Sequence, residues 1–267
     1  MIELVVTDLD GTLWDVADQL HPRTAAAIEE LGRRGVDLLV ATGRRVTSTR
    51  DPLARAGLAP SAVVLNGALG LDLATAQRFH RQPFPAEEAV IVFDAFVTHG
   101  LEPCVYVDHV GVDAFLGPSP STHPEHVRAL GTTAQRGDLA VVVREMPVLG
   151  FGVIGRPIEE LRAAQELIAL HAEAHLGRAF NYPDSALTVA PRGLSKWAGV
   201  MAYCKLRGLD HEAVLAIGDG PNDLELLQHA AIAVVPEDGD PAALARAKHV
   251  VAPPDRGGWA EILDFIG

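Results

Sequence analysis

Two aspartates stand one residue apart near the start of the chain, in Asp8-Leu9-Asp10-Gly11-Thr12, directly after the apolar run Leu4-Val5-Val6. If that run is a buried strand, both carboxylates lie on the loop at its carboxyl end, where open parallel sheets bind their ligands. One carboxylate can then bind metal and attack as a nucleophile, while the other transfers protons. Gly11 permits a sharp turn, and the Thr12 hydroxyl can steady the loop by bonding to backbone. The segment predicts covalent catalysis by an aspartate.

A second acidic loop, Gly218-Asp219-Gly220-Pro221-Asn222-Asp223, follows the apolar run Val214 to Ile217. In a parallel sheet its polar side chains would converge on the same edge as Asp8. Aspartates from two loops, completed by water, form an oxygen shell suited to Mg²⁺. Taken alone, Asn222 or Asp223 could serve only as a helix cap, since both residue types are favoured there. Together the two loops favour a magnesium site.

Two further segments could hold a phosphate group. Thr42-Gly43-Arg44 closes the apolar run that ends at Ala41, and a hydroxyl followed by exposed backbone N–H groups at a helix start suits an anion. A simple turn at the end of a strand accounts for it equally well. Lys196 stands in the first turn of an expected helix, where its ammonium could neutralise a phosphate as a point charge.

The formal charges of these groups require a cation. Asp8, Asp10, Asp219 and Asp223 around a phosphate dianion would carry a formal −6. Such crowding in a partly dehydrated cleft costs many kcal/mol. One Mg²⁺ and Lys196 would add +3, and a proton on Asp10 would leave −2. Like charges are therefore expected to raise the pKa of Asp10, which would suit it to protonate a leaving alkoxide.

The order of apolar runs and helical segments predicts an α/β fold with a doubly wound parallel sheet, because strand, helix and strand alternate in both outer parts of the chain. Strands are expected at residues 4–6, 36–41, 63–65, 214–217, 231–235 and 249–252, and helices at residues 21–34, 195–207, 223–229 and 241–248.

The middle of the chain has a different rhythm, typical of an inserted α+β module. Helices are expected at residues 85–98 and 157–175, strands on either side of a turn at 108–111, at 139–144 and at 148–154, and two short strands ending at 189. Prolines near both crossings suit linkers, so the predicted boundaries are residues 1–83 and 186–267 for the core and 84–185 for the insertion.

Taken together, the four polar segments resemble the four ordered motifs of the haloacid dehalogenase superfamily of aspartate-nucleophile phosphatases. The spacing between the Thr42 and Lys196 segments, with Asn66-Gly67-Ala68 after the third strand, is similar to the Cof-type branch, subfamily IIB, whose insertion is an α/β cap. That branch acts mostly on phosphorylated sugars and other small metabolites. The resemblance implies a Mg²⁺-dependent phosphatase with an aspartyl-phosphate intermediate.

The resemblance also implies a role for each matching residue. Asp8 corresponds to the nucleophile and Asp10 to the general acid/base. Asp8, the backbone carbonyl of Asp10 and Asp219 correspond to the metal ligands, with Asp223 behind them. The expected substrate and phosphate contacts are Thr42, Gly43, Arg44, Asn66, Lys196 and Asn222.

Other polar residues are less informative. Arg44, Arg45 and Asn66 could reach a substrate, as could Asn181, Tyr182 and Asp184 near the second crossing, and a surface position accounts for each of them at least as well. His123 and His126 lie three apart on an expected helix without a carboxylate or cysteine partner, and are interpreted as solvated surface.

The overall composition limits the possible functions. The chain has 267 residues, 48% of them hydrophobic and 21% charged, which is the composition of a folded globular protein. Its net charge of −13 disfavours nucleic acid and membrane surfaces as partners. Cys104 and Cys204 match no metal pattern and are expected as buried free thiols. Without a signal-like segment, a cytoplasmic location is expected.

Two alternatives stay open at this level. A phosphomutase of the same superfamily would share every motif but would pass the phosphoryl group to a second hydroxyl. A catalytically silent binding or regulatory module is also possible, because a fold does not determine function. The sequence names neither the phosphorylated substrate nor the oligomeric state.

Overall fold

The computed structural model describes residues 1–267 and divides into two compact units. The first unit contains Met1–Gly43, Thr49–Arg81 and Ser195–Gly267; the second contains Arg44–Ser48 and Gln82–Leu194. The long insertion begins at Gln82, two residues before the expected position 84. It ends at Leu194, nine residues after the expected position 185, so residues 186–194 lie in the second unit and not in the core as expected. The short segment Arg44–Ser48, which comes from the first part of the sequence, also belongs to the second unit. None of the helices combines the length and apolar character that a membrane span requires.

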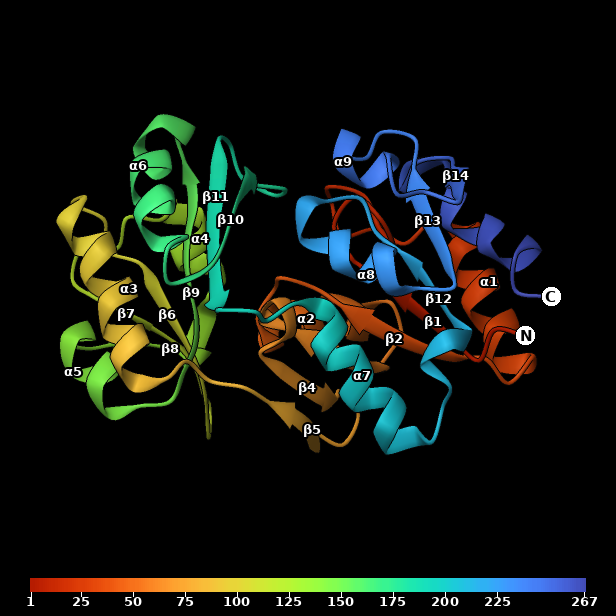
Figure 1. Ribbon diagram of the computed structural model, residues 1–267, viewed down its shortest axis with the longest axis horizontal. Helices are drawn as coiled ribbons and strands as arrows, with labels where there is room; N and C mark the ends of the chain where they lie inside the picture. Colours follow the sequence, from red (N-terminus) through yellow and green to blue (C-terminus); the bar gives the residue numbers. More distant parts are fainter. The chain divides into compact units, whose positions relative to one another are not determined.

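The first unit is built on an eight-stranded sheet in the order β14-β13-β12-β1-β2-β3-β4-β5 (Figure 1). The strands are β1 (Leu4–Thr7), β2 (Asp37–Ala41), β3 (Ser61–Val64), β4 (Leu69–Asp72), β5 (Arg78–Arg81), β12 (Val214–Ile217), β13 (Ile232–Pro236) and β14 (His249–Val251). Six of them pair in parallel, as expected, whereas β4 and β5 add an antiparallel edge that the sequence analysis did not include.

The helices of this unit bury one apolar side each. They are α1 (Pro22–Arg33), α2 (Val46–Arg55), α7 (Lys196–Arg207), α8 (Leu224–His229) and α9 (Pro241–Leu244), with short 3-10 turns at Leu65–Gly67, His211–Ala213, Pro221–Asp223, Pro254–Arg256 and Gly258–Asp264. Only the part of α2 from Thr49 onward belongs to this unit. Val200 of α7 and Leu226 of α8 pack with Leu4 and Val6 of β1. Alternate residues of a strand share one face, so α7 and α8 cover the same side of the sheet. Helix α9 ends earlier than residue 248, where the sequence analysis placed its end.

The parallel pairing has a direct consequence for the polar loops. Strands β1, β2, β3 and β12 are neighbours in the sheet and run in the same direction. Their carboxyl ends therefore lie at one edge, and the loops that follow them start there.

The second unit contains a six-stranded sheet in the order β10-β11-β9-β6-β7-β8. Its strands are β6 (Cys104–His109), β7 (Val112–Leu116), β8 (Ala134–Arg136), β9 (Val148–Arg156), β10 (Ala172–Arg178) and β11 (Ser185–Pro191). Its helices are α3 (Ala86–Thr98), α4 (Pro124–Ala129), α5 (Leu139–Glu145) and α6 (Ile158–Ile168), with a 3-10 turn at Gly131–Thr133. Helices α3, α5 and α6 lie along one face of this sheet (Figure 1). Their residues form one apolar core with the sheet, which includes Phe96 and Phe151.

Two expectations for the second unit were wrong. Residues 139–144, expected as a strand because of three consecutive valines, form α5. The Asp138 carboxylate accepts hydrogen bonds from the backbone N–H groups of Ala140 and Val141, and Leu139, Val142 and Val143 recur at helical spacing on the buried side. The helix expected to reach residue 175 ends at Ile168, and β10 follows it.

The expectation for His126 was wrong, whereas that for the two cysteines is confirmed. His126 is not solvated surface: its Nδ1 lies 2.9 Å from Oγ1 of Thr122, and its ring lies against Tyr182. Burial, together with the charge of Arg45, lowers the pKa of His126 to about 4. Cys104 and Cys204 are buried free thiols, as expected.

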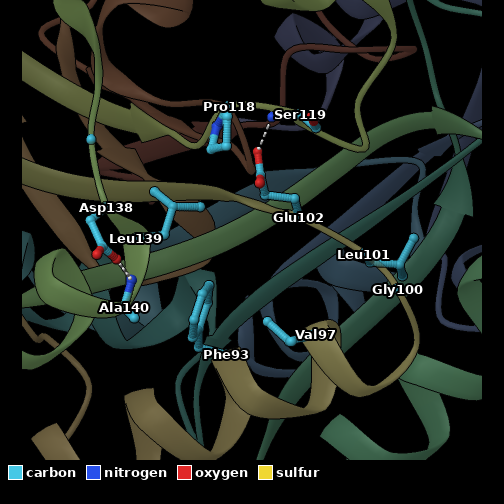
Figure 2. Close-up of a pocket in the computed structure, with 11 residues that line it drawn as sticks. Phe93, Val97, Gly100, Leu101, Glu102, Pro118, Ser119, Asp138, Leu139 and Ala140 are labelled. Carbon is cyan, nitrogen blue, oxygen red and sulfur yellow. Dashed lines mark hydrogen bonds between the residues drawn. The ribbon is translucent and has the colours of Figure 1, made fainter.

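The second unit also has a cavity of about 660 Å³ beside α3 (Figure 2). Its apolar lining comes from Phe93, Val97 and Leu139, and Glu102 and Asp138 also line it. The Glu102 carboxylate accepts a hydrogen bond from the backbone N–H of Ser119, and the Asp138 carboxylate accepts one from that of Ala140. None of the residues singled out for chemistry lines this cavity.

Gly199 gives a test of how α7 is seated on the sheet. A Cβ at this position would lie 2.4 Å from Cγ1 of Val63 on β3. We expect Gly199→Ala to destabilise the protein by about 1–3 kcal/mol through overpacking, more than the ~1 kcal/mol that alanine adds to helix propensity. Urea-induced unfolding measures the change. The control is Gly32→Ala in α1, where no heavy atom lies within 4 Å of the new Cβ, and which should stabilise by about 0.5 kcal/mol. Equal effects at both sites would contradict the close packing.

Candidate active site

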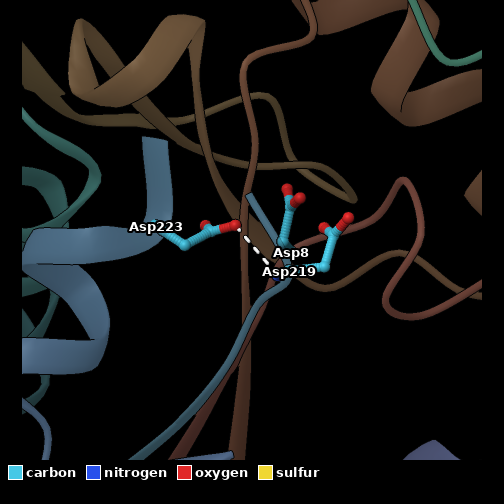
Figure 3. A group of neighbouring side chains, drawn as sticks. All are labelled: Asp8, Asp219 and Asp223. Carbon is cyan, nitrogen blue, oxygen red and sulfur yellow. Dashed lines mark hydrogen bonds between the residues drawn. The ribbon is translucent and has the colours of Figure 1, made fainter. Parts of the chain in front are cut away.

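Three carboxylates from two loops meet at the carboxyl edge of the first unit's sheet. Asp8, Asp219 and Asp223 each present one oxygen such that all three oxygens lie within 4.8 Å of one another. Figure 3 shows the Asp8 and Asp219 carboxylates side by side, with Asp223 reaching toward them from the start of α8. The convergence expected from the parallel strands is present.

Asp8 is held by the end of β1. Its backbone N–H donates to the carbonyl of Ile217 at 2.9 Å, which extends the β1–β12 pairing by one residue. The Thr7 hydroxyl donates to the Asp8 carbonyl at 2.7 Å, and Nε1 of Trp259 donates to that hydroxyl at 3.0 Å. Trp259 was not singled out from the sequence, because it lies 252 residues away and no local motif marks it.

Asp223 is folded back onto its own loop. Its Oδ2 accepts hydrogen bonds from the backbone N–H groups of Asp219 at 3.2 Å and Gly220 at 3.0 Å, while its Oδ1 accepts from Nζ of Lys196 at 2.7 Å. A Cβ on Gly218 would lie 2.5 Å from the Asp223 carboxyl carbon, so this fold requires glycine there. Both oxygens of Asp223 are occupied by N–H donors, and the residue orients the loop and the lysine.

Lys196 is buried between two of these carboxylates. Only 1% of its side chain is exposed, and Nζ lies 2.8 Å from Oδ1 of Asp8 and 2.7 Å from Oδ1 of Asp223. Burial alone would lower the pKa of Lys196, but Asp223 and Asp8 raise it above its ordinary value. The ammonium is therefore charged and already paired, a state that the sequence analysis, which assigned it to phosphate alone, did not include.

One ammonium cannot neutralise three carboxylates. Burial is the main reason why the pKa of Asp8 rises to about 7, with Lys196 opposing and Asp223 and Asp10 adding to the rise. Burial also raises the pKa of Asp219 to about 8, helped by the charges of Asp8 and Asp223. The site thus holds uncompensated negative charge, and protons or a cation must balance it.

Asp10 and Thr12 lie on the same loop. Oδ1 of Asp10 accepts a hydrogen bond from Nε1 of Trp14 at 3.4 Å. The Thr12 hydroxyl donates to Oδ1 of Asp219 at 3.1 Å, so it joins the two acidic loops instead of bonding to backbone as expected. The expected proton on Asp10 stays a prediction.

The remaining loops carry polar groups that pack closely at the same edge. The backbone N–H of Thr42 donates to the carbonyl of Val63 at 2.8 Å, and the N–H of Asn66 donates to the carbonyl of Thr42 at 3.1 Å. Asn66 has a left-handed backbone, with φ of 53°, and its Oδ1 accepts from Nδ2 of Asn222 at 3.0 Å. A Cβ on Gly43 would lie 3.0 Å from Oδ1 of Asn66. The structure therefore brings Thr42, Gly43, Asn66 and Asn222 into one network.

Arg44 is the exception among the expected site residues. It belongs to the second unit, where Nη1 donates to the carbonyl of Ser48 at 3.1 Å. A substrate contact by Arg44 stays a prediction.

The donor set fits a small divalent cation. Three carboxylates and one ammonium leave a formal −2 in a buried setting, and the Asp8 and Asp219 carboxylates lie next to each other while Asp223 is occupied. Mg²⁺ is bound in proteins by one or two carboxylates together with several waters. Asp8 and Asp219 are the side chains that would hold it.

The comparisons with known proteins show the family and the fold class. A model of the haloacid dehalogenase-like hydrolase family matches residues 5–263. Pyridoxal phosphate phosphatase of Escherichia coli is 24% identical over 93% of this chain and 92% of its own length. Phosphoglycolate phosphatase of Haloarcula marismortui is 29% identical over 92% and 89% of the two chains. A solved sugar phosphatase of subclass IIB of this superfamily aligns with a TM-score of 0.77 over 99% of both chains at 22% identity, which confirms the fold class.

The raised pKa values predict how the stability of the metal-free protein depends on pH. The unfolded carboxyls ionise near 3.8, whereas Asp8 and Asp219 ionise near 7 and 8 in the folded state. Between these values the unfolded state binds fewer protons, so stability falls as pH rises from about 4 to 8. We expect Asp219→Asn to flatten this slope and to raise Tm at pH 8 in the presence of a chelator.

The matched control is Asp255→Asn, which removes the same formal charge from an exposed position. Thermal unfolding of both variants and the wild type between pH 5 and 8.5 makes the comparison. If Asp219→Asn and Asp255→Asn have the same slope, the uncompensated charge does not lie at Asp219.

Proposed function

Because the chain belongs to the haloacid dehalogenase-like hydrolases, we propose that it is a Mg²⁺-dependent phosphatase that acts on a small phosphorylated metabolite through an aspartyl-phosphate at Asp8. The observation that carries the proposal is the Asp8 carboxylate itself: buried, next to Asp219, and 2.8 Å from the Lys196 ammonium. The family and the enzyme class expected from the sequence, a phosphoric monoester hydrolase, are confirmed.

In the first step, an oxygen of Asp8 attacks phosphorus, and the bond between phosphorus and the substrate oxygen breaks. The departing alkoxide takes a proton from Asp10. Lys196 favours the ionised form of Asp8, against the effect of burial, and orients it, since its ammonium bonds to Oδ1 of Asp8 and leaves the other oxygen to react. The pair is held from both sides: the Asp223 carboxylate accepts a hydrogen bond from Lys196, and the Asp8 N–H donates to the carbonyl of Ile217.

In the second step, Asp10 accepts a proton from water, and the water oxygen attacks the phosphorus of the aspartyl-phosphate. The bond from phosphorus to Asp8 breaks, inorganic phosphate forms and the Asp8 carboxylate is restored. The position of Asp10 two residues after Asp8, on the loop that Gly11 turns with φ of 74°, supports this exchange of roles.

Bound Mg²⁺ would supply the positive charge that lets an anionic carboxylate approach an anionic phosphate. Asp8 and Asp219 would hold it with the backbone carbonyl of Asp10, and Asp223 would orient the Asp219 loop through its N–H contacts. The hydroxyl of Thr42, the backbone N–H of Gly43, Asn222 and Lys196 would bind the phosphate oxygens. Arg44 and Asn66 are proposed to reach the rest of the substrate.

We propose that the second unit is a cap domain that selects the substrate. The relatives' names point to phosphate monoesters of small molecules, pyridoxal phosphate and phosphoglycolate among them, and the subclass IIB structure is a sugar phosphatase. A sugar phosphate is the class that the branch favours. A cytoplasmic location stays a prediction.

The test of the proposed function is a panel of phosphorylated sugars, pyridoxal 5′-phosphate and phosphoglycolate, incubated with the protein and Mg²⁺ and scored by release of inorganic phosphate. At least one member should be hydrolysed. Conversion to an isomeric monophosphate without phosphate release would identify a mutase instead, and no reaction with any member would contradict the proposal.

Asp8→Asn should abolish this activity. The asparagine amide has nearly the same shape as the carboxylate but is a poor nucleophile, so kcat is expected to fall by more than ~10³-fold while the variant stays folded. Steady-state kinetics on the best substrate, or on an activated aryl phosphate, measure the loss. Asp255→Asn serves as the matched control and should keep wild-type kcat. A variant at Asp8 with a tenth of wild-type kcat would disprove covalent catalysis there.

Chelation of divalent metal should stop turnover, and added Mg²⁺ should restore it. Ca²⁺ should restore it poorly, because calcium accepts more and longer oxygen contacts and can engage both oxygens of the Asp8 carboxylate, which would displace the nucleophile from the line of attack. The same kinetics, repeated with each cation after dialysis against chelator, make the test. Full activity in chelator, with no bound metal detected by elemental analysis, would exclude the site.

A further inference from the structure

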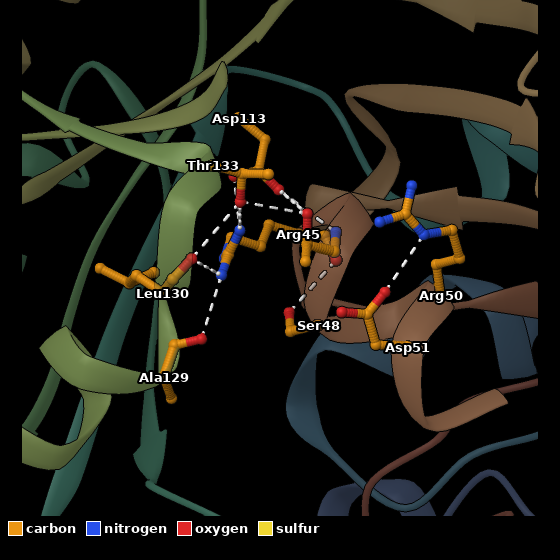
Figure 4. Close-up of polar contacts among 9 residues, drawn as sticks. Arg45, Ser48, Arg50, Asp51, Asp113, Ala129, Leu130 and Thr133 are labelled. Atoms are coloured by element: carbon orange, nitrogen blue, oxygen red, sulfur yellow. Dashed lines mark hydrogen bonds and ion pairs between the residues drawn. The ribbon is translucent and has the colours of Figure 1, made fainter. Parts of the chain in front are cut away.

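Arg45 is an arginine enclosed almost entirely in the second unit, with 4% of its surface exposed. The structure therefore contradicts the surface position expected for it as one of two possibilities. Its Nη1 donates to Oδ1 of Asp113 at 2.5 Å and to Oγ1 of Thr133 at 2.8 Å (Figure 4). Its Nη2 donates to the carbonyl of Leu130 at 2.7 Å and, more weakly, to that of Ala129 at 3.4 Å.

Asp113 of β7 binds the same short segment a second time. Its Oδ2 accepts from the backbone N–H of Thr47 at 3.2 Å and from the Thr47 hydroxyl at 2.7 Å, and only 8% of Asp113 is exposed. The Asp113 carboxylate therefore binds both Arg45 and Thr47, the residues on either side of Val46, where α2 begins. We refer to Arg45, Thr47, Asp113 and Thr133 as the Arg45 node.

A buried ion pair of this kind contributes little net stability, because the cost of removing both charges from water offsets their attraction. Such a network instead fixes the positions of its members. When every donor and acceptor in a buried polar network is paired, any other arrangement leaves buried polar groups unpaired and is strongly unfavourable. The Arg45 node is therefore better suited to hold a segment in place than to stabilise the unit as a whole.

The segment that it holds adjoins the proposed phosphate loop. Thr42 is bound within the first unit through its hydrogen bonds with Val63 and Asn66, and Gly43 is packed at 3.0 Å from the Asn66 side chain. Only Gly43 and Arg44 separate Thr42 from Arg45, and consecutive Cα atoms are about 3.8 Å apart. Because the connection is so short, the two segments cannot move independently by much. A displacement of Arg45 therefore displaces the Thr42–Gly43 turn as well.

We infer that Arg45 is a positioning residue, and that the Arg45 node makes the phosphate-binding geometry of Thr42 and Gly43 depend on a carboxylate of the second unit, Asp113. Arg45 itself does not touch the substrate. The inference rests on the proposed function for the role of Thr42 and Gly43 in binding phosphate. The mechanical part, that the Arg45 node orders the Thr42–Gly43 turn, stands on the contacts alone.

The test compares Asp113→Asn with Val153→Ala. The first breaks the Arg45 node, and the second creates a cavity in the apolar core of the same unit without touching the node. Thr133→Val removes one acceptor from Arg45 and is a milder variant that keeps the test valid if Asp113→Asn does not fold. Titration calorimetry measures two affinities: that for inorganic phosphate in the presence of Mg²⁺, and that for Mg²⁺ alone. NMR measures the rate of amide hydrogen exchange at Thr42, Gly43 and Arg44, which are outside the Arg45 node.

A displacement of about 1 Å in a binding geometry can cost ~10²-fold. Asp113→Asn is therefore expected to weaken phosphate binding by about tenfold or more and to speed hydrogen exchange at the three amides. Thr133→Val should change both quantities in the same direction. Neither variant should alter the affinity for Mg²⁺. Val153→Ala should lower Tm but leave phosphate affinity and exchange unchanged. Equal effects of Val153→Ala and Asp113→Asn would overturn the inference, as would unchanged exchange in both variants of the node.

The two proposals fail in different ways. If the wild type neither binds phosphate nor hydrolyses phosphate esters, the proposed function is wrong, and the exchange rates still decide whether the Arg45 node orders the Thr42–Gly43 turn. If the wild type is a phosphatase and the node variants bind phosphate as it does, the positioning role is wrong and the proposed function is unaffected.

Discussion

Excess negative charge in a buried place is the constraint around which the first unit is organised. Asp8, Asp219 and Asp223 lie together with a single ammonium. Burial, with the charges of the neighbouring carboxylates added to it, raises the pKa of Asp8 to about 7 and that of Asp219 to about 8. Such an arrangement is unfavourable for a folded protein without a bound cation, because burial penalises each unpaired carboxylate. Its presence is a sign of function, since strongly shifted carboxyl groups gather where charge is needed for binding or chemistry.

The rest of the core supplies what this arrangement needs. Parallel strands bring the two acidic loops to one edge, Gly218 leaves room for Asp223 to fold back, and the start of α7 delivers Lys196. The position of α7 depends in turn on Gly199, which lets the helix approach β3 at Val63. Packing inside the sheet and chemistry at its edge are thus linked through one helix, and residues that touch no substrate still determine where the nucleophile's partner lies.

The second unit has a different relation to the site. It reaches into the first part of the sequence through Arg44–Ser48, so the chain passes between the units at this segment as well as at the two ends of the long insertion. Buried polar contacts with Asp113 hold the segment, directly after the residues proposed to bind phosphate. In such an arrangement an insertion can influence the binding loop through the backbone, in addition to any side chains that it offers to a substrate.

The sequence by itself determined the core fold and the convergence of the two acidic loops, because both depend on local patterns. An apolar run followed by a polar loop predicts a parallel strand and its ligand-binding end, as for Asp8 and Asp219. It predicted less well where two local preferences compete. The valines of residues 139–144 favoured a strand, whereas the Asp138 cap and the burial of every third or fourth side chain produce helix α5.

Contacts between distant residues were decided only by the tertiary structure. The pairing of Lys196 with Asp8 and Asp223, the bond from Thr12 to Asp219, the support of Thr7 by Trp259 and the burial of Arg45 against Asp113 all join segments far apart in the chain. A charged or polar side chain has the same local sequence signal whether it lies in water or in a buried pair. Its partner is selected by the packing of the whole unit, since only there is it known which donors and acceptors have lost their water.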